Sequence, residues 1–313
     1  MERKVKKELD VLVIGGGPAG LMAGVYAARS GQNTAIIEKE TCGGQITQTG
    51  EIENMPGFVM TTGPELAMAM TEQAMNSGVE IEFDMVEEIK FGKKAGELHT
   101  VITSEAEFET KTVIITTGAG PRKLSATGAA QFDGRGIHYC ALCDGAFYRE
   151  KNVLVVGGGN TAIEDALYLA GIAKSVTVVD FADEFIAHKV MVDKLMEREN
   201  VKTFHGYAVQ EIIGDKKIES IRIKKNSDNT EETLAIDGVF VAIGRIPNTT
   251  LFKDLIEMTK YGYVVVDEKM QTSVPGVFSA GDLNDKQVRQ IVTAVSDGCI
   301  AAVNADQYIK EHF

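Results

Sequence analysis

The sequence predicts an α/β protein with two Rossmann-like dinucleotide-binding domains, the second inserted in the first. The main observation is a series of strand, glycine turn, helix, strand and acid that occurs at 10–38 and again at 152–180. A chain of 313 residues is also longer than one core usually serves, so two domains are expected. A lone glycine turn is weak evidence, whereas the ordered series, repeated at matching spacing, predicts two dinucleotide sites.

The first copy begins with DVLVIGGGPAG at 10–20, a β-rich run followed by Gly15, Gly17 and Gly20. Helical periodicity follows, and the next apolar strand ends on Glu38. Glycines let the backbone approach a pyrophosphate at a helix N-terminus, and the acid accepts a hydrogen bond from a ribose 2′-hydroxyl. We therefore expect a dinucleotide on this turn.

The second copy, NVLVVGGGNTA at 152–162, has Gly157 and Gly159 but places Ala162 at the third glycine position. Its second strand ends on Asp180, at the same interval from the first glycine as in the first copy. A βαβ unit without a ligand is the alternative for either copy, and the matching spacing argues against it.

Period-2 alternation elsewhere predicts the remaining strands. The run KTVIITTG at 111–118 is expected to return to the first sheet, and GVFSAGD at 276–282 is a further strand that ends on an acid, before a helix from about Gln287. The turns TTGAGP and AIGRIP are the expected crossover points. We therefore expect an FAD-type domain over 1–117 and 246–313, and an inserted nicotinamide-nucleotide-type domain over 118–245.

Composition excludes several classes of protein. Hydrophobic residues at 44% and charged residues at 25% are typical of a soluble globular protein, and a net charge of −13 argues against nucleic acid or an anionic membrane as partner. Residues 11–28 are uncharged and long enough for a membrane span, but consecutive glycines and a proline indicate strand, turn and helix. The basic start is followed by this strand and not by a signal-peptide core, so a cytoplasmic location is expected.

The stretch HYCALCDGAFY carries Cys140 and Cys143 in a CxxC spacing. A structural zinc site would need two more ligands, and no second CxxC or close Cys/His pair exists, so no metal is expected. A pair of inert buried thiols is a second alternative. The pattern favours a third, a small-loop disulfide that opens and closes by thiol exchange, with Asp144 giving or taking the proton.

A dithiol between two dinucleotide units favours an electron-transfer chain. A nicotinamide would reduce a flavin, the flavin would reduce the Cys140–Cys143 disulfide, and the dithiol would reduce a partner protein. Cys42 and Cys299 show no pairing pattern and are expected to be structural thiols, although Cys42 precedes a glycine pair near the expected flavin. The five histidines show no pairing pattern either, and we assign them no catalysis.

Together these motifs resemble one family. From end to end the chain is similar to low-molecular-weight flavin-dependent thioredoxin reductases, in the stretches GGGPAG, GGQITQTGEIENMPGF, TTGAGPRKL, CALCDG, GGGNTAIEDALYL, AIGRIPNT and TSVPGVFSAGD. The resemblance implies a homodimeric, FAD-dependent thioredoxin-disulfide reductase whose inserted domain rotates, so that nicotinamide and CxxC meet the flavin in turn. It also implies that Cys143 lies against the flavin and that Cys140 attacks thioredoxin or a thioredoxin-like protein.

The resemblance also implies where the cofactors bind. It puts the FAD pyrophosphate at Gly15, Gly17 and Gly20 and the ribose at Glu38. It also implies further FAD contacts. Gly44, Gln45 and Asn54 would lie near the flavin, and Val86 would lie near the adenine. Asp282 would contact the ribityl–phosphate region, and Arg289 and Gln290 would contact the isoalloxazine. Further candidate cofactor-binding residues in the same motifs are Pro18, Ala19, Lys39, Gly118, Asn160, Thr161, Gly244 and Gly281.

The second unit departs from the family pattern. Where the family has a basic cluster that holds the 2′-phosphate of NADPH, this chain has Asp180, Phe181, Ala182 and Ile186. Losing two charged hydrogen bonds would cost ~3–6 kcal/mol, about two to four decades in affinity. Because Asp180 also repels a phosphate and suits a free 2′-hydroxyl, NADH is expected to be favoured over NADPH. Ala162 points mildly the other way. His188 and Lys189 lie close enough to reach a phosphate, although such residues more often form a solvated helix face.

Two alternatives stay open. Some relatives take electrons from ferredoxin or another flavin. The intact GGGNTA and the acidic net charge argue against such a donor here. A basic patch around the CxxC would suit ferredoxin or an acidic thioredoxin equally. The residues of that patch are Arg122, Lys123, Arg135 and Arg149. A dinucleotide-binding carrier module without disulfide turnover is the alternative from another class. Replacing Cys143 by Ser separates the two, because a carrier would not need the thiol.

Overall fold

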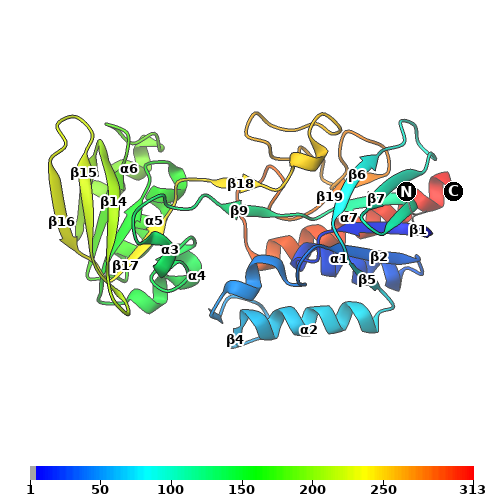
Figure 1. Ribbon diagram of the computed structural model, residues 1–313, viewed down its shortest axis with the longest axis horizontal. Helices are drawn as coiled ribbons and strands as arrows, with labels where there is room; N and C mark the ends of the chain where they lie inside the picture. The colour runs from blue at the N-terminus through cyan, green and yellow to red at the C-terminus, as the bar shows by residue number, and fades with distance from the viewer. Residues whose placement is uncertain (1–4) are drawn as a thin grey trace. The chain divides into compact units, whose positions relative to one another are not determined.

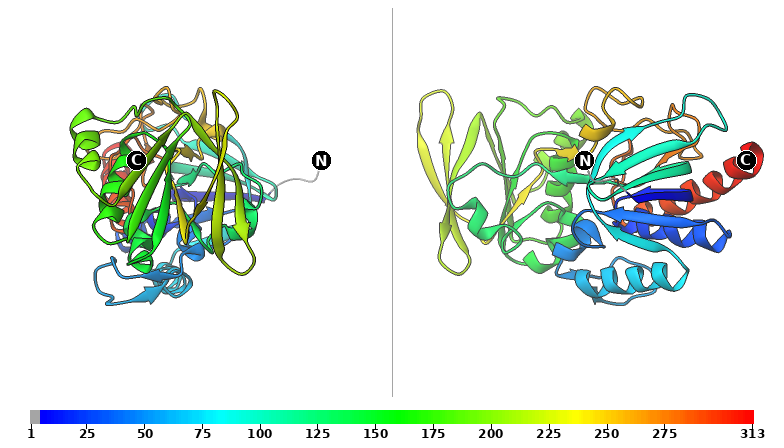
Figure 2. Two further views of the ribbon diagram at one scale, coloured as in Figure 1. Left: turned by 90° about the vertical axis from the view of Figure 1, so that its left-hand side faces the viewer. Right: turned by 45° about the vertical axis from the view of Figure 1, so that its right-hand side comes forward.

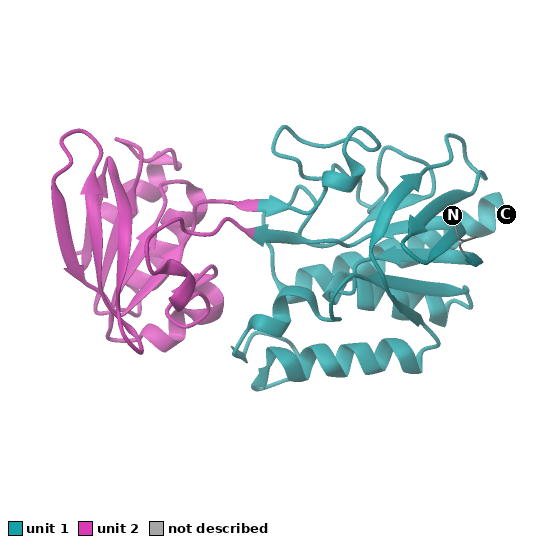
Figure 3. Cartoon of the chain, in the orientation of Figure 1, with its two compact units in different colours: residues 1–120, 246–313 teal, residues 121–245 magenta. Residues whose placement is uncertain are grey.

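The computed structural model describes residues 5–313 and divides the chain into two compact units (Figure 3). Unit 1 comprises Met1–Gly120 and Ile246–Phe313, and unit 2 comprises Pro121–Arg245. The two connecting segments contain the short strands β9 (Ala119–Pro121) and β18 (Arg245–Pro247), which pair with each other.

Unit 1 is built on a mixed sheet. Its strand order is β5 (Glu80–Phe83), β2 (Thr34–Glu38), β1 (Val5–Ile14), β8 (Ala106–Ile115), β7 (His99–Thr103) and β6 (Val86–Lys90), with β19 (Val277–Ser279) also paired to β8. The β5, β2, β1, β8 and β19 pairings are parallel, and β6, β7 and β8 form an antiparallel meander. The parallel strands bring the carboxyl ends of β1, β2 and β8 to one edge, where ligands of such sheets bind.

Helices cover one face of this sheet. Figures 1 and 2 show α1 (Pro18–Arg29) and α7 (Ile291–His312) side by side, with α2 (Gly63–Asn76) beyond α1. The crossing of α1 and α7 requires a glycine, because a Cβ on Gly298 would lie 2.1 Å from the carbonyl oxygen of Ala19. This close approach fixes the start of α1, which follows the first glycine turn.

On the opposite face, the parallel strands bury side chains against residues of β6 and β7 and of the segment around 251–266. Leu12, Ile14 and Ile37 from the parallel strands are buried there against Phe252 and Val264. The remaining short elements of unit 1 are η1 (Gly44–Gln48), β3 (Glu51–Ile52), β4 (Thr61–Thr62) and η3 (Thr250–Phe252). Near-continuous apolar runs in β1 and β8 therefore reflect burial on both faces.

Unit 2 repeats the plan with a five-stranded parallel sheet. Its order is β10 (Ile137–His138), β17 (Gly238–Val241), β11 (Asn152–Val156), β12 (Ser175–Asp180) and β13 (Val201–His205). One face packs against the helices α5 (Asn160–Ala170) and α6 (Lys189–Met196) and the short α4 (Ala141–Asp144). The other face packs against α3 (Ala129–Phe132) and the antiparallel sheet of β14 (Tyr207–Gly214), β15 (Ile218–Lys225) and β16 (Glu231–Ala235).

The predicted fold class, with two Rossmann-like domains, is confirmed. The uncharged run at 11–28 forms the end of β1, the glycine turn and most of α1, and no helix among residues 5–313 has the length and apolarity that crossing a membrane requires. One predicted boundary is wrong. The last helix begins at Ile291 and not near Gln287, because Gln290 adopts an extended conformation (φ −138°, ψ 160°) as its N-cap.

Candidate functional site

The first glycine turn joins β1 to α1 and leaves its outer side open. Gly15 has a φ of +110°, and a Cβ there would lie 2.6 Å from the carbonyl oxygen of Thr116 on the neighbouring strand. Gly20 is equally restricted, since its Cβ would lie 1.9 Å from the carbonyl oxygen of Gly15. At Gly17 and Gly118, by contrast, a Cβ would meet no atom within 4 Å. The turn therefore presents bare backbone at the start of α1, as a pyrophosphate requires.

Glu38 ends β2 directly beside this turn. Its side chain is 9% exposed, and Oε2 accepts a hydrogen bond from the backbone N–H of Gly16 at 2.7 Å. Oε1 accepts one from Glu40 at 2.9 Å. These bonds hold the carboxylate against the glycine turn, at the position where the motif places a ribose. Lys39 points away into an exposed pair with Glu40, so the structure gives it no contact with the turn.

The residues expected near the flavin fall into two groups. Gly44 approaches the first turn, because a Cβ on it would lie 3.4 Å from Gly17 Cα, and Gln45 Nε2 donates to the carbonyl oxygen of Ala119 at 2.5 Å. Asn54 Nδ2 donates to Gln290 Oε1 at 3.2 Å, which joins the loop after η1 to the start of α7. Val86 lies at the start of β6, partly buried against the core of the opposite face.

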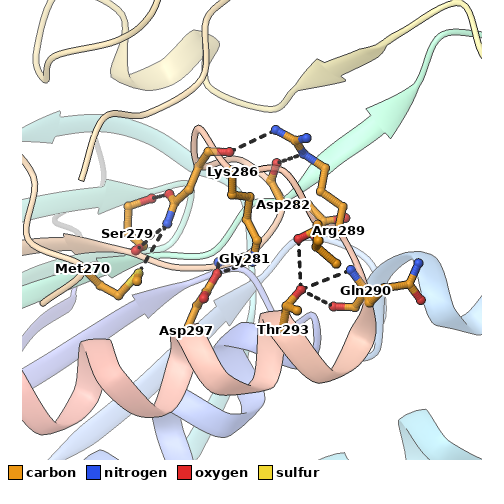
Figure 4. Close-up of polar contacts among 11 residues, drawn as sticks. Met270, Ser279, Gly281, Asp282, Lys286, Arg289, Gln290, Thr293 and Asp297 are labelled. Atoms are coloured by element: carbon orange, nitrogen blue, oxygen red, sulfur yellow. Dashed lines mark hydrogen bonds and ion pairs between the residues drawn. The ribbon is translucent and has the colours of Figure 1, made fainter. Parts of the chain in front are cut away.

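The segment after β19 forms a polar cluster at the start of α7 (Figure 4). The backbone N–H of Gly281 donates to Asp297 Oδ2 at 3.1 Å, and Lys286 Nζ bonds the same oxygen at 2.5 Å. Arg289 Nε donates to the carbonyl oxygen of Asp282 at 3.2 Å. The guanidinium of Arg289 also lies 4.4 Å from the centroid of the Tyr263 ring. The loop that carries Asp282, Arg289 and Gln290 is thus held by its own side chains.

The two free thiols lie in unit 1. Cys42 is 7% exposed, and its sulfur would be 3.0 Å from a Cβ on Gly16, so it packs beneath the first turn. Burial and the nearby Glu38 carboxylate raise the pKa of the Cys42 thiol, which keeps it protonated. Cys299 is half-buried on α7. The roles of both stay predictions.

The second glycine turn joins β11 to α5 with a similar backbone. Gly157 has a φ of +131°, and its Cβ would lie 2.5 Å from the carbonyl oxygen of Ala242. A Cβ on Gly159 or on Gly244 would meet nothing within 4 Å. Asn160 and Thr161 form the first turn of α5, and Thr161 is exposed. The turn is open on the side where a nucleotide would lie.

Asp180 ends β12 and faces this turn from behind. It is 8% exposed, and a Cβ on Gly158 would lie 1.8 Å from its Oδ2 atom. Oδ2 is buried and has no hydrogen-bond partner among residues 5–313. Burial raises the pKa of the Asp180 carboxyl, while the backbone N–H groups of Ala182 and Phe181 and the nearby His205 oppose this shift. A buried acceptor without a donor is unfavourable until a ligand hydroxyl supplies one.

The segment after Asp180 folds back over the turn. The backbone N–H of Ile186 donates to the carbonyl oxygen of Gly158 at 3.0 Å, and that of His188 donates to Asn160 Oδ1 at 2.8 Å. Phe181 and Ile186 stand out into solvent, with exposed fractions of 73% and 85%. These two positions therefore present apolar side chains to solvent and bring no cation to the turn.

The disulfide joins Cys140 to Cys143, whose Cα atoms are 5.3 Å apart. Cys140 is the N-cap of α4, and the N–H groups of Cys143 and Asp144 donate to its carbonyl oxygen at 3.3 and 3.1 Å. Both cysteines are partly exposed, and Leu142 between them is 57% exposed. The helical turn brings the two sulfurs together and leaves them accessible.

Two ionisable residues beside the disulfide were missed by the sequence reasoning. His138, to which no role was assigned, lies with Nδ1 3.3 Å from Asp144 Oδ2. Asp165 on α5 accepts a hydrogen bond from the backbone N–H of Ala141, inside the CxxC. Burial and the neighbouring Glu164 raise the pKa of Asp165 to about 7, against the opposing charge of Arg245. The spacing of His138 to the CxxC is the only sequence signal that pointed to either.

Comparison with known proteins identifies the family. Residues 9–298 match the model of the pyridine nucleotide-disulphide oxidoreductases. The chain belongs to this family. It is 40% identical to a thioredoxin reductase of Listeria innocua over 98% of this chain and 95% of that protein. It is 43% identical to a 34.2 kDa protein in the rubredoxin operon of Clostridium pasteurianum, over 98% and 99% of the two chains.

A solved structure extends the similarity to the fold. The thioredoxin reductase of Streptococcus pyogenes is 42% identical to this chain, covers 97% of it with 99% of its own length, and superposes with a TM-score of 0.89. The prediction of an FAD-dependent oxidoreductase that acts on a disulfide is thus confirmed for this member of the pyridine nucleotide-disulphide oxidoreductases, and a pyridine nucleotide belongs to the family's chemistry.

Proposed function

We propose that this oxidoreductase reduces the disulfide of thioredoxin or a thioredoxin-like protein, with NADH as the favoured electron donor. The single observation that carries the proposal is the accessible Cys140–Cys143 disulfide on α4 in a flavoprotein of this family. When bound, FAD supplies two-electron transfer between a reduced donor and a disulfide.

FAD would be held by unit 1. The open backbone at Gly17 and the fixed Glu38 carboxylate fit a pyrophosphate and a ribose. The flavin would lie between two groups of residues. One is the segment next to this turn, which includes Gly44 and Gln45, and the other is the Asp282–Gln290 loop. Pro18 at the start of α1 fits the same role, because its missing N–H leaves the later N–H groups of the first turn to face the phosphate.

Cys140, Cys143 and Asp144 would have different roles in the reaction at the disulfide. Cys140, at the start of α4, would attack the partner disulfide, and Cys143 would close the internal bond again. Asp144, next to Cys143, would exchange the proton that thiol chemistry requires. The exposed side chains of Leu142 and Phe147, at 57% and 42%, supply apolar contact area beside the sulfurs, as docking of a partner protein requires.

The preference for NADH rests on Asp180. Its buried Oδ2 atom lacks a donor among the described residues, which suits a ribose 2′-hydroxyl and opposes a 2′-phosphate. Phe181, Ala182 and Ile186 bring no positive charge to the rim, and His188 is tied through its backbone to Asn160. NADPH stays the weaker donor in this proposal, and ferredoxin is the alternative.

We also propose a homodimer formed by unit 1 and a cytoplasmic location. Support for the dimer comes from α1 and α2, which border a hollow of about 630 Å³ lined by Met22 and Tyr26 among others. Met68 and Met75 on α2 are 68% and 60% exposed. Apolar side chains exposed together on one helix are typical of a surface that another protein covers.

Turnover with three donors tests the proposal. NADH, NADPH and chemically reduced ferredoxin are each supplied to the FAD-loaded protein with oxidised thioredoxin, and free thiols are counted. We expect thiols to appear fastest with NADH. A chain that produced none with any donor, while its flavin was intact, would have a different disulfide substrate.

A further inference from the structure

The most unusual cluster near the disulfide consists of three side chains in contact, those of Asp144, His138 and Tyr148. His138 lies on β10, two residues before Cys140, and its ring stands between the other two. Nδ1 is 3.3 Å from Asp144 Oδ2, and Nε2 is 2.8 Å from the Tyr148 hydroxyl. The His138 and Asp144 side chains are only 14% and 20% exposed. Each of these three side chains therefore contacts another protein group in place of bulk water.

Tyr148 fixes the tautomer of His138. Burial, together with the charges of Asp144 and Asp237, raises the pKa of Tyr148 to about 12, so it is a neutral phenol at physiological pH. The phenol donates its hydrogen to Nε2 of a neutral imidazole, which leaves the proton of the ring on Nδ1. That Nδ1–H faces the carboxylate of Asp144. This assignment satisfies all three groups at once.

Packing holds the imidazole in this orientation. Its ring stacks on Phe240 at a centroid distance of 5.4 Å and an angle of 29°. Tyr148 meets both rings edge-on, at 5.2 Å from His138 and 5.3 Å from Phe240. Phe240 is 1% exposed on β17 and cannot move aside without opening the core. His138 is thus locked toward Asp144, the side chain next to Cys143.

We propose that His138 is a positioning and proton-holding residue for Asp144 in the reductase reaction. The inference rests on the proposed thiol chemistry of the Cys140–Cys143 pair. Asp144 and His138 exchange the Nδ1 proton: the pair is either carboxylate and imidazolium, or carboxylic acid and an imidazole that keeps its proton on Nε2. Tyr148 keeps the imidazole aligned throughout, because its hydroxyl accepts from Nε2 in both of these forms and donates to Nε2 when the neutral ring holds its proton on Nδ1.

The proton balance of the reaction defines what the pair does. Opening the Cys140–Cys143 bond takes two electrons, which a bound reduced flavin would supply, and two protons, and yields two thiols. Cys140 gives its thiol proton to the Asp144 carboxylate, and its thiolate attacks the partner disulfide, so that one S–S bond forms as the partner's S–S bond breaks. Cys143 then attacks the mixed disulfide, which restores the Cys140–Cys143 bond and releases the second partner sulfur as a thiolate. Asp144 passes the Cys140 proton to the first leaving thiolate, and the Cys143 proton reaches the second one by the same route. His138 holds the proton on Nδ1 while Asp144 is ionised, so the two protons of the dithiol end on the two thiols of the partner.

The other charged groups around His138 enter the test. Asp144 faces Nδ1 directly, and Asp237 acts on Tyr148 from the start of β17. Lys151 Nζ lies 5.2 Å from the centroid of the Tyr148 ring. Asp165 meets α4 at the backbone of Ala141, and burial and Glu164 raise its pKa to about 7. A pH profile of the wild type therefore includes a group other than the His138–Asp144 pair, and only the variants isolate the contribution of His138.

The decisive variants are His138→Gln and Tyr148→Phe, with His312→Gln and Tyr207→Phe as matched controls elsewhere. We expect His138→Gln to lower kcat for the partner disulfide by about 10- to 100-fold near neutral pH, with KM within about twofold. The pH profile of kcat should change shape with it, because Asp144 loses the imidazole that faces it. Tyr148→Phe keeps the ring and its packing, and should lower kcat by a smaller factor, ~3- to 10-fold.

A double-mutant cycle separates proton transfer from packing. In an Asp144→Asn background, His138→Gln should have little further effect on kcat, because the two residues act as one unit. Equal and independent effects of the two substitutions would overturn the proposal. So would a His138→Gln protein with the wild-type rate and pH profile, which would leave His138 as a core aromatic only.

A second readout needs neither donor nor partner. The dithiol is reduced chemically, and the rate at which iodoacetamide alkylates it is measured against pH. The midpoint should shift by ~0.5 or more in His138→Gln, because the imidazole beside Asp144 is gone, and should stay in place in the controls. If thioredoxin proves not to be the substrate, this shift still decides the role of His138. An unshifted midpoint in both His138→Gln and Tyr148→Phe would refute it.

Discussion

The two glycine turns of the chain share a backbone and differ in how the acid behind each one is satisfied. Their first glycines, Gly15 and Gly157, have φ values of +110° and +131°. Behind the first turn, both carboxylate oxygens of Glu38 accept backbone N–H groups, at 2.7 and 2.9 Å. Behind the second, Oδ2 of Asp180 is buried without a donor among residues 5–313. The Glu38 carboxylate is thus fixed by the backbone and keeps further lone pairs for a ribose, whereas Oδ2 of Asp180 has its acceptor capacity unused.

The third position of each turn differs too. Gly20 must be glycine, because its Cβ would lie 1.9 Å from the carbonyl oxygen of Gly15. The second turn accepts Ala162, whose Cβ would lie 3.3 Å from one built on Gly157. The first turn is therefore the tighter of the two, as suits a permanently bound cofactor, and the second is looser, as suits a nucleotide that must leave. The predictions below test this contrast.

The largest effect is expected at the disulfide. Cys143→Ser should abolish reduction of the partner disulfide, because the internal S–S bond can no longer form, while FAD stays bound to the first turn. Absorbance near the flavin band and thiol counting measure the two outcomes together. Turnover that survived in the Ser variant would show that electrons do not pass through this pair.

The next largest effect is expected at Gly20. Gly20→Ala forces the first turn open by the clash with Gly15 and should lower the FAD content of the purified protein by at least about 10-fold. The matched change in the second turn, Ala162→Gly, should leave the FAD content as it is. Flavin released by heat, measured by fluorescence against protein concentration, gives the comparison. Equal FAD loss in both variants would mean that the two turns are not specialised.

A smaller effect is expected on the choice of donor. Phe181→Arg combined with Ile186→Arg adds two cations at exposed positions and should shift the ratio of kcat/KM for NADPH over NADH by about 10-fold or more. Val190→Arg, at a residue 67% exposed on α6, is the control for added charge alone. If the control shifts the ratio as much as the double variant, the rim does not select the nucleotide.

The smallest effect is expected on stability, at Asp165. The pKa of Asp165 in the folded chain is about 7 and exceeds the ordinary value of 3.8, so the folded chain binds the proton more tightly than the unfolded chain. The resulting stabilisation is full at low pH and is lost as pH rises through 7. Asp165→Asn keeps an acceptor for Ala141 and removes the titration. From pH 5 to pH 8 the wild type should therefore lose about 2–3 kcal/mol relative to the variant.

Thermal unfolding followed by circular dichroism at the two pH values measures this difference. Asp193→Asn, at an exposed position on α6, is the control and should track the wild type. A constant difference between wild type and Asp165→Asn at both pH values would show that Asp165 is ionised throughout.

Much of this molecule could be predicted from local sequence. The glycine turns, the strands that end on Glu38 and Asp180, and the CxxC are each determined by neighbouring residues, and the structure has them where the spacing indicates. What local sequence could not give is contact between distant segments. His138 meets Tyr148 only because β10 and η2 (Gly145–Tyr148) pack on Phe240, and Asp165 reaches Ala141 only because α5 lies under α4. Residues 181–188 likewise fold back onto Gly158 through a backbone hydrogen bond, which no sequence motif predicts.

The central claim is that the two turns hold different nucleotides and that the second favours a free 2′-hydroxyl. Anaerobic bleaching of the flavin absorbance band tests it most directly, with NADH, NADPH and reduced ferredoxin in separate cuvettes. We predict fast bleaching by NADH and slow bleaching by NADPH. Fast bleaching by NADPH would show that other residues hold the phosphate, and bleaching by ferredoxin alone would show that the second turn no longer serves a nucleotide.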